Sequence, residues 1–157
     1  MRSILTKMTL ACAALCLSAS LYAGTAAEDV QAEGAYVRAV PPGQPNSAAF
    51  MSLTNKGETD HVLVAAESNV SKVAELHTHS MEGGMMKMRP VEKIDLPAGQ
   101  TVKLQPGGLH IMLIGLTRQL SPNEDVEITL VFEDGSRTSL QAPVKTVQQT
   151  MEHHHHH

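Results

Sequence analysis

Histidine and methionine side chains gather in one stretch of this 157-residue chain. The sixteen residues from Glu75 to Pro90 hold two histidines and four methionines, and further on His110 and Met112 stand two positions apart. In a β-strand, side chains at i and i+2 point to the same face, so His110 and Met112 can address one point in space. Imidazole and thioether form a soft ligand set, which suits Cu(I) better than zinc, magnesium or calcium. The cluster therefore predicts a site for monovalent copper.

A methionine in a β-domain can also be a gap-filling core residue. Met51 lies in the alternating run 48–53 and is predicted to be such a residue, whereas His61 is predicted to be a surface histidine. The cluster differs, because four of the nine methionines fall within eight positions beside two histidines. Loops lie on the surface. We therefore expect residues 78–88, and the turn before His110, to be loops that expose copper ligands.

The elements that must position this cluster are short alternating runs of apolar and polar residues. They recur at ~8–12-residue spacing between turn signals, with no amphipathic helical window between them, which is typical of an all-β sandwich or small barrel. A hairpin turn is predicted at 133–136. We find no internal repeat or linker, so a single domain is expected. The predicted strands are 34–40, 48–53, 61–66, 72–77, 85–91, 101–104, 110–116, 126–132 and 137–144.

The amino terminus has the pattern of a secretory signal. Arg2 and Lys7 precede an apolar stretch over 8–21, which is shorter than the ~20 residues of a bilayer span. Cleavage after Ala27 or Ala26 fits the small-x-small rule best, and cleavage after Ala23 is a further option. We expect a signal peptide over 1–27, a copper-binding domain over 28–147, and a flexible tail with five histidines over 148–157.

Composition excludes several classes of protein. Both cysteines, Cys12 and Cys16, lie in the predicted signal, so the exported part has no thiolate for blue-copper, zinc-finger or iron–sulfur sites. Neither cysteine follows a leucine by three positions, which argues against a lipoprotein signal. The part after residue 27 carries 10 basic and 16 acidic residues, and aromatics are 3% of the chain. This balance excludes nucleic acid as a partner.

The spacing of these histidines and methionines resembles that of a known family. The order His77, ten residues, Met88, twenty-one residues, His110, one residue, Met112 is similar to the signature of the periplasmic copper chaperones called PCuAC. The resemblance runs from about residue 34 to 144. It extends to the flanking segments Glu75-Leu76-His77, Met86-Lys87-Met88-Arg89-Pro90, Pro106-Gly107-Gly108 and Phe132-Glu133-Asp134-Gly135.

The resemblance implies a cupredoxin-like, that is immunoglobulin-like, β-sandwich with His77, Met88, His110 and Met112 as Cu(I) ligands. It implies a monomeric carrier that is not an enzyme. In the periplasm it would pass copper to the copper A centre of a haem-copper cytochrome c oxidase, or to a thiol-bearing assembly factor. Thioether ligands would hold Cu(I) in an oxidising compartment without loss to disulfides. Outside the signature stand four residues that could be auxiliary ligands, a transfer path or simple variation: His79, Met81, Met85 and Met86.

Other interpretations stay open. Copper sequestration or resistance would need the same ligands, and a metal-free interaction module would follow if the cluster were accidental. A copper enzyme is disfavoured, because a methionine-rich site favours Cu(I) and resists redox cycling. The five terminal histidines could be native or a purification tag, and in either case could take Cu(II).

Overall fold

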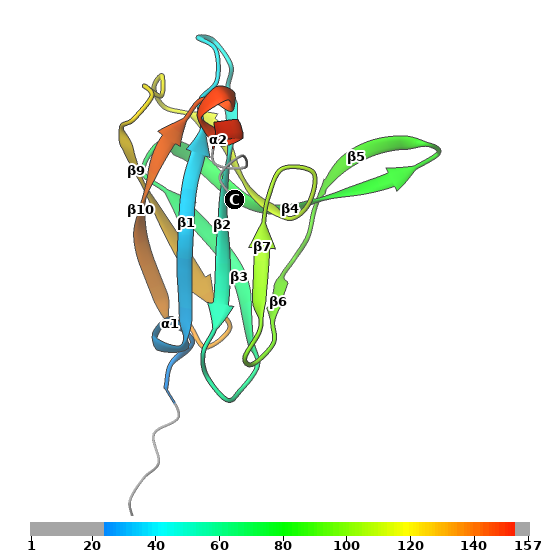
Figure 1. Ribbon diagram of the computed structural model, residues 1–157, viewed down its shortest axis with the longest axis vertical. Helices are drawn as coiled ribbons and strands as arrows, with labels where there is room; N and C mark the ends of the chain where they lie inside the picture. The colour runs from blue at the N-terminus through cyan, green and yellow to red at the C-terminus, as the bar shows by residue number, and fades with distance from the viewer. Residues whose placement is uncertain (1–23, 153–157) are drawn as a thin grey trace, which may run out of the picture.

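The computed structural model describes residues 24–152; the segments 1–23 and 153–157, which include most of the predicted signal and the five histidines, lie outside the described residues. β-Strands make up most of the described chain (Figure 1). In chain order the elements are α1 (Ala26–Asp29), β1 (Val30–Arg38), β2 (Asn46–Asn55), β3 (His61–Ser68), β4 (Ser71–Glu82), β5 (Met85–Pro90), β6 (Ile94–Leu96), β7 (Thr101–Leu104), β8 (His110–Leu116), β9 (Asp125–Phe132), β10 (Arg137–Lys145) and α2 (Val147–Glu152).

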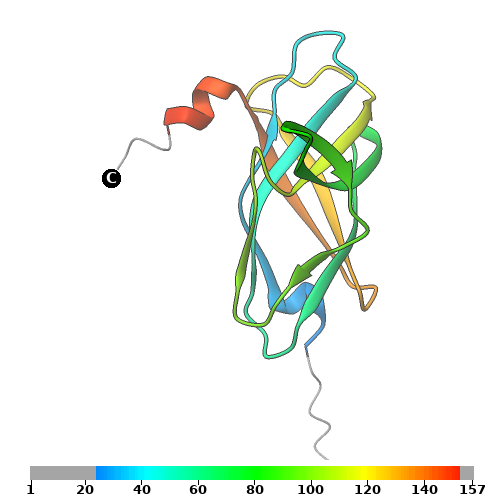
Figure 2. The same ribbon diagram turned by 90° about the vertical axis from the view of Figure 1, so that its right-hand side faces the viewer.

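The strands form a continuous ladder that curls into two facing layers. They pair in the order β5-β4-β8-β2-β1-β10-β9-β3-β6, with β7 added to β2. The β1–β10 pair is parallel and joins the two layers. Figure 2 shows the layers packed against each other, with α2 at the margin. The predicted all-β sandwich is confirmed.

Strand alternation supplies the core between the layers. Ile111 and Leu113 of β8 belong to the same core cluster as Leu63 of β3 and Ile128 of β9, and all four side chains are fully buried. Met51 is also buried, at 3% exposure, so its predicted core role is confirmed. The predicted hairpin is present too, because β9 and β10 pair antiparallel across residues 133–136.

The segment 78–88 is an exposed β-hairpin. Its predicted exposure and the predicted strand over 85–91 are confirmed, whereas the prediction of a loop over 78–88 was wrong. β4 continues to Glu82 and pairs with β5 from Met85 onward. Between them Gly83 and Gly84 both have positive φ, 60° and 78°. Two positive φ values define the tight two-residue turn whose twist matches that of paired strands. The outer part of β4 and β5 projects from the sandwich as an arm (Figure 1).

Two smaller differences separate the predicted elements from the observed ones. The short strand β6 was not predicted. Helix α2 begins at Val147, the last residue of the predicted domain, and continues into the predicted tail. Within residues 24–152, no helix is long and apolar enough to span a membrane.

His61 is buried at 6% exposure, so its prediction as a surface histidine was wrong. Its Nε2 lies 2.8 Å from Asp29 Oδ2, and its Nδ1 lies 2.6 Å from Glu133 Oε1. The imidazole thus connects the end of α1, the start of β3 and the β9–β10 turn. These carboxylates are distant in sequence, which is why local pattern could not place the histidine.

The two carboxylates favour the charged imidazolium. Burial lowers the pKa of His61, but the hydrogen bonds and negative charges of Asp29 and Glu133 outweigh burial, and the net pKa is raised. For Glu133, burial acts to raise the pKa, and the bonds from His61 and from the Val62 N–H outweigh it and lower the pKa. A raised histidine pKa contributes stability below the unfolded-state value, which is lost as pH rises through the folded-state value.

We predict that His61→Gln lowers the free energy of unfolding by roughly 2–3 kcal/mol between about pH 4.5 and 6.5, where the ion pairs are intact. The difference should shrink as pH rises through the raised pKa of His61, and as pH falls through the lowered pKa of Glu133. Urea unfolding of both proteins across pH measures it, and the other titrating groups cancel in the comparison. An equal difference at pH 5.5 and pH 9 would contradict a charged pair.

Candidate metal site

The candidate site lies on the outer face of the layer that contains β5, β4, β8 and β2. Ile111 and Leu113 point into the core, so His110 and Met112 must point to the opposite face of β8. His110 pairs with His77 across β8 and β4. The strand register thus places two of the predicted ligands directly opposite each other.

The remaining predicted ligands flank this histidine pair on opposite sides. Met88 of β5 pairs with His79, one step toward the tip of the arm. Met112 pairs with Glu75 on β4 and with Ala48 on β2, one step away from the tip. Same-face residues along a strand are about 7 Å apart. The four predicted ligands therefore occupy three neighbouring rows of one face.

His110 is enclosed by other rings although it faces away from the core. Its exposure is 1%, and its ring centroid lies 5.2 Å from that of His79, 5.8 Å from that of His77 and 6.2 Å from that of Phe50. Beside it is a cavity of about 180 Å³, which Met88 and His79 also line. The full lining is Arg38, Ala48, Phe50, His79, Met88, Pro106, Gly107 and His110.

Hydrogen bonding fixes which nitrogen of each histidine carries the proton. His77 Nε2 lies 2.8 Å from Glu75 Oε2, and His110 Nδ1 lies 2.9 Å from the Gly108 carbonyl oxygen. Carboxylate and carbonyl oxygens accept, so these two nitrogens donate. The other nitrogens, His77 Nδ1 and His110 Nε2, are buried and have no hydrogen-bond partner. Each ring therefore has a buried nitrogen without a partner, and a bond from its other nitrogen holds it in place, as in metal-binding histidines. His110 lines the cavity, whereas His77 does not.

The electrostatics also keep His110 neutral. Burial lowers its pKa, and the Gly108 carbonyl acts in the opposite direction. The positive charge of Arg38, and those that His79 and His77 carry when protonated, lower the pKa further. Arg38 itself lies over the Phe50 ring, with its guanidinium carbon 5.1 Å from the ring centroid. A neutral imidazole can donate its lone pair at pH 7 without first losing a proton.

His79 belongs to this site, although sequence reasoning left it outside the signature. Its Nδ1 lies 3.4 Å from the Gly108 carbonyl oxygen, and its ring is closer to His110 than that of His77. The signal was present in the sequence, because His77 and His79 share a face if the strand continues past His77. Met112 is half-buried and does not line the cavity. Among residues 24–152, no three His, Cys, Asp or Glu side chains are grouped to hold a metal ion.

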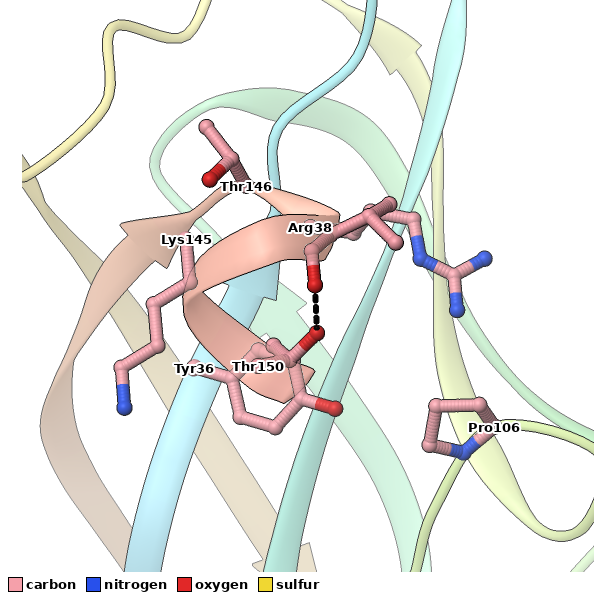
Figure 3. A pocket seen from close by; sticks show the side chains of 7 residues that line it. Tyr36, Arg38, Pro106, Lys145, Thr146 and Thr150 are labelled. Atoms are coloured by element: carbon pink, nitrogen blue, oxygen red, sulfur yellow. Dashed lines mark hydrogen bonds between the residues drawn. The ribbon is translucent and has the colours of Figure 1, made fainter. Parts of the chain in front are cut away.

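A second cavity of about 220 Å³ adjoins the first and shares Arg38 and Pro106 with it. Figure 3 shows α2 at its edge, where the Thr150 hydroxyl donates to the Val147 carbonyl at 2.7 Å. Its other lining residues are Tyr36, Lys145 and Thr146. These are cationic and hydroxyl groups rather than soft ligands, so this cavity is not the candidate metal site.

The fold and the outer-face His/Met site define a PCuAC-type β-sandwich domain, and comparison with known proteins agrees. Residues 30–144 match the family described as "Putative lipoprotein LpqE-like", and the chain belongs to this family. It is 36% identical over 123 residues to "Putative lipoprotein Lxx21020" of Leifsonia xyli subsp. xyli, covering 78% of this chain and 73% of that protein.

Solved structures give the same result. The solution structure of apo-DR1885 from Deinococcus radiodurans is 37% identical, with a TM-score of 0.60 over 93% of this chain and 94% of that one. That of CuI-DR1885 is 38% identical, with a TM-score of 0.58 over 81% and 83%. The copper-bound PCuAC domain from PmoF2 shares the fold, with 22% identity and a TM-score of 0.65 over 79% and 95%. The PCuAC resemblance of the sequence is confirmed.

We predict that His110→Leu leaves the free energy of unfolding of the metal-free protein within about 1 kcal/mol of the original. The variant loses the bond to Gly108 but removes a buried nitrogen without a partner, and these effects oppose each other. Ile111→Ala, on the opposite face of the same strand, should lose about 2–5 kcal/mol. Urea unfolding in the presence of a chelator measures both. Equal losses in the free energy of unfolding for the two variants would mean that His110 stabilises the fold by packing, as Ile111 does.

Proposed function

We propose that this chain is a periplasmic copper chaperone that binds one Cu(I) through His77, Met88, His110 and Met112 and delivers it to a copper A centre. The observation that carries the proposal is the pair of buried, unpartnered nitrogens on His77 and His110. An unpaired buried polar atom costs free energy, commonly about 1–3 kcal/mol. Two such atoms on directly paired residues are explained if a cation sits between them.

The donor set favours Cu(I) over harder ions. Neutral imidazole and thioether are soft ligands, and Met88 and Met112 flank the histidine pair. DR1885, a 38% identical protein, has been solved in a form described as CuI-DR1885, which supports the same cargo for this chain. His79 would be a fifth candidate ligand, able to replace one of the four during loading or release.

The ligand charges favour delivery rather than storage. Four neutral ligands leave the positive charge of Cu(I) uncompensated, so an acceptor with thiolates would hold the ion more tightly once docked. Met88, at 45% exposure, is the most accessible of the ligands. It lies on the arm, where an incoming ligand could attack before the old ones leave. Sequestration is the alternative function, and it differs in predicting slow release.

The proposed periplasmic location requires export, and contacts at the amino-terminal end of the domain bear on where the signal peptide is cleaved. Ala26 is fully buried, and its N–H donates to Asp134 Oδ2 at 2.8 Å. The hydroxyl of Ser136 and this N–H lower the pKa of Asp134 to about 2. Thr25 caps α1 with a reciprocal bond pair to Glu28. A cut after Ala26 or Ala27 would remove these contacts, so we propose that the cut follows Ala23.

Intact mass measurement of protein recovered from the periplasm should therefore give a chain that begins at Gly24. A chain beginning at Ala27 or Glu28 would contradict this boundary. A lipid-modified chain beginning at Cys12 or Cys16 would instead show a membrane-anchored protein, in keeping with the description of its relatives.

We further predict that Cu(I) moves to a reduced copper A domain faster than it dissociates. The loaded protein should first show one tightly bound Cu(I) with mixed nitrogen and sulfur scattering in X-ray absorption. Stopped-flow mixing with the acceptor is then compared with mixing into excess chelator. Transfer that is independent of acceptor concentration, and no faster than capture by chelator, would identify a copper store. Oxygen and nitrogen scattering alone would remove the site assignment itself.

A further inference from the structure

We propose that Met81 and Met86 form a second, outer Cu(I) site on the arm, which receives the ion and passes it inward by way of His79 and Met88. This inference rests on the proposed function, because it supplies the route by which the inner site is loaded. It is carried by the register of β4 and β5 and by the exposure of their methionines.

The register places the soft side chains of the arm on one face. Met81 pairs with Met86, and His79 pairs with Met88. Directly paired residues share a face, and so do residues at i and i+2. Because His77 lies two residues before His79, this face leads from the tip of the arm to His77 and its partner His110. We call it the soft face of the arm.

The outer methionines are free to bind an ion. Met81 is 66% exposed and Met86 is 60% exposed. Paired side chains have Cβ atoms about 4.5–5.5 Å apart, and methionine has three rotatable bonds. Two thioether sulfurs can therefore converge on one ion without moving the backbone. The tip is also open, since a Cβ atom added at Gly83 or Gly84 would meet nothing within 4 Å.

The charged residues of the arm lie on the other face. Glu82 pairs with Met85, and its carboxylate is 3.7 Å from the ammonium of Lys87 and 3.8 Å from the guanidinium of Arg89. Positive side chains are thus held away from the soft face, where they would repel Cu(I). Met85, at 67% exposure, shares this charged face and is as accessible as Met81.

The soft face offers steps of suitable length. Its rows are Met81 with Met86, then His79 with Met88, then His77 beside His110, at intervals of about 7 Å. At each step a neutral ligand replaces a neutral ligand, copper remains Cu(I), and no electron or proton is transferred. Each row offers two ligands, and their burial increases from the exposed thioethers of Met81 and Met86 to the enclosed imidazoles. At the inner end Met88 and Met112 add to the histidine pair, which gives four candidate ligands. The ion is therefore bound more tightly toward the inner site, which favours inward transfer.

The test uses the full exported chain with ¹³C-labelled methionine methyl groups and Ag(I) as a soft, diamagnetic probe. The first equivalent should shift the methyl signals of Met88 and Met112. Further Ag(I) should shift those of Met81 and Met86 and leave that of Met85 in place. Because the signals are assigned by residue, Ag(I) on the terminal histidines does not interfere. Met86→Leu should abolish the Met81 shift, whereas the matched control Met85→Leu should preserve it.

Loading kinetics test the receiving role. The double variant Met81→Leu/Met86→Leu should take Cu(I) from a chelator several times more slowly, with unchanged final occupancy of the inner site, while Met85→Leu loads normally. Static signals at Met81 and Met86, an equal shift at Met85, or loading of the double variant at the original rate would each overturn the proposal. If instead Met88 and Met112 stay unshifted, the inner site and the proposed function fail, which is a separate result.

Discussion

The strict alternation of strand β8 is the constraint on which the rest of the molecule depends. Ile111 and Leu113 are fully buried between the layers, and a side-chain period of two then fixes His110 and Met112 on the other face. A shift of one residue would place two ligands in the core and two core residues at the site. The register of β8 therefore sets both the packing of the core and the orientation of the candidate ligands.

Two buried nitrogens on and beside that strand are left unpaired, which does not favour folding. Buried polar atoms are normally paired, yet His77 Nδ1 and His110 Nε2 are not. Glu75 and the Gly108 carbonyl hold the opposite nitrogens of the same rings, so the unpaired lone pairs are oriented rather than left to rotate. A local free-energy cost of this kind is common at functional sites, because the rest of the fold supplies the stability and a bound ligand completes the bonding.

The molecule separates its stabilising and binding chemistry in space. His61 and its carboxylate partners connect α1 and the β9–β10 turn. Helix α1 lies at the lower end of the sandwich, away from the arm, which projects from its side (Figure 1). On the arm itself, the ion pairs of Glu82 occupy one face and the methionines Met81 and Met86 the other. On the arm, charged side chains are thus kept off the face that would carry a monovalent soft ion.

Local patterns along the chain were enough to predict the fold class, the core role of Met51, the β9–β10 turn and the shared face of His110 and Met112. Each of these follows from local period or turn chemistry, which a short window of residues contains. The folded structure was needed to place His61 in the interior, because its partners Asp29 and Glu133 come from distant segments. It also decided the role of His79, which meets His110 only when β4 continues beyond the predicted strand end and pairs with both neighbours. Periodicity states which face a side chain takes, whereas strand pairing across the chain states what it meets there.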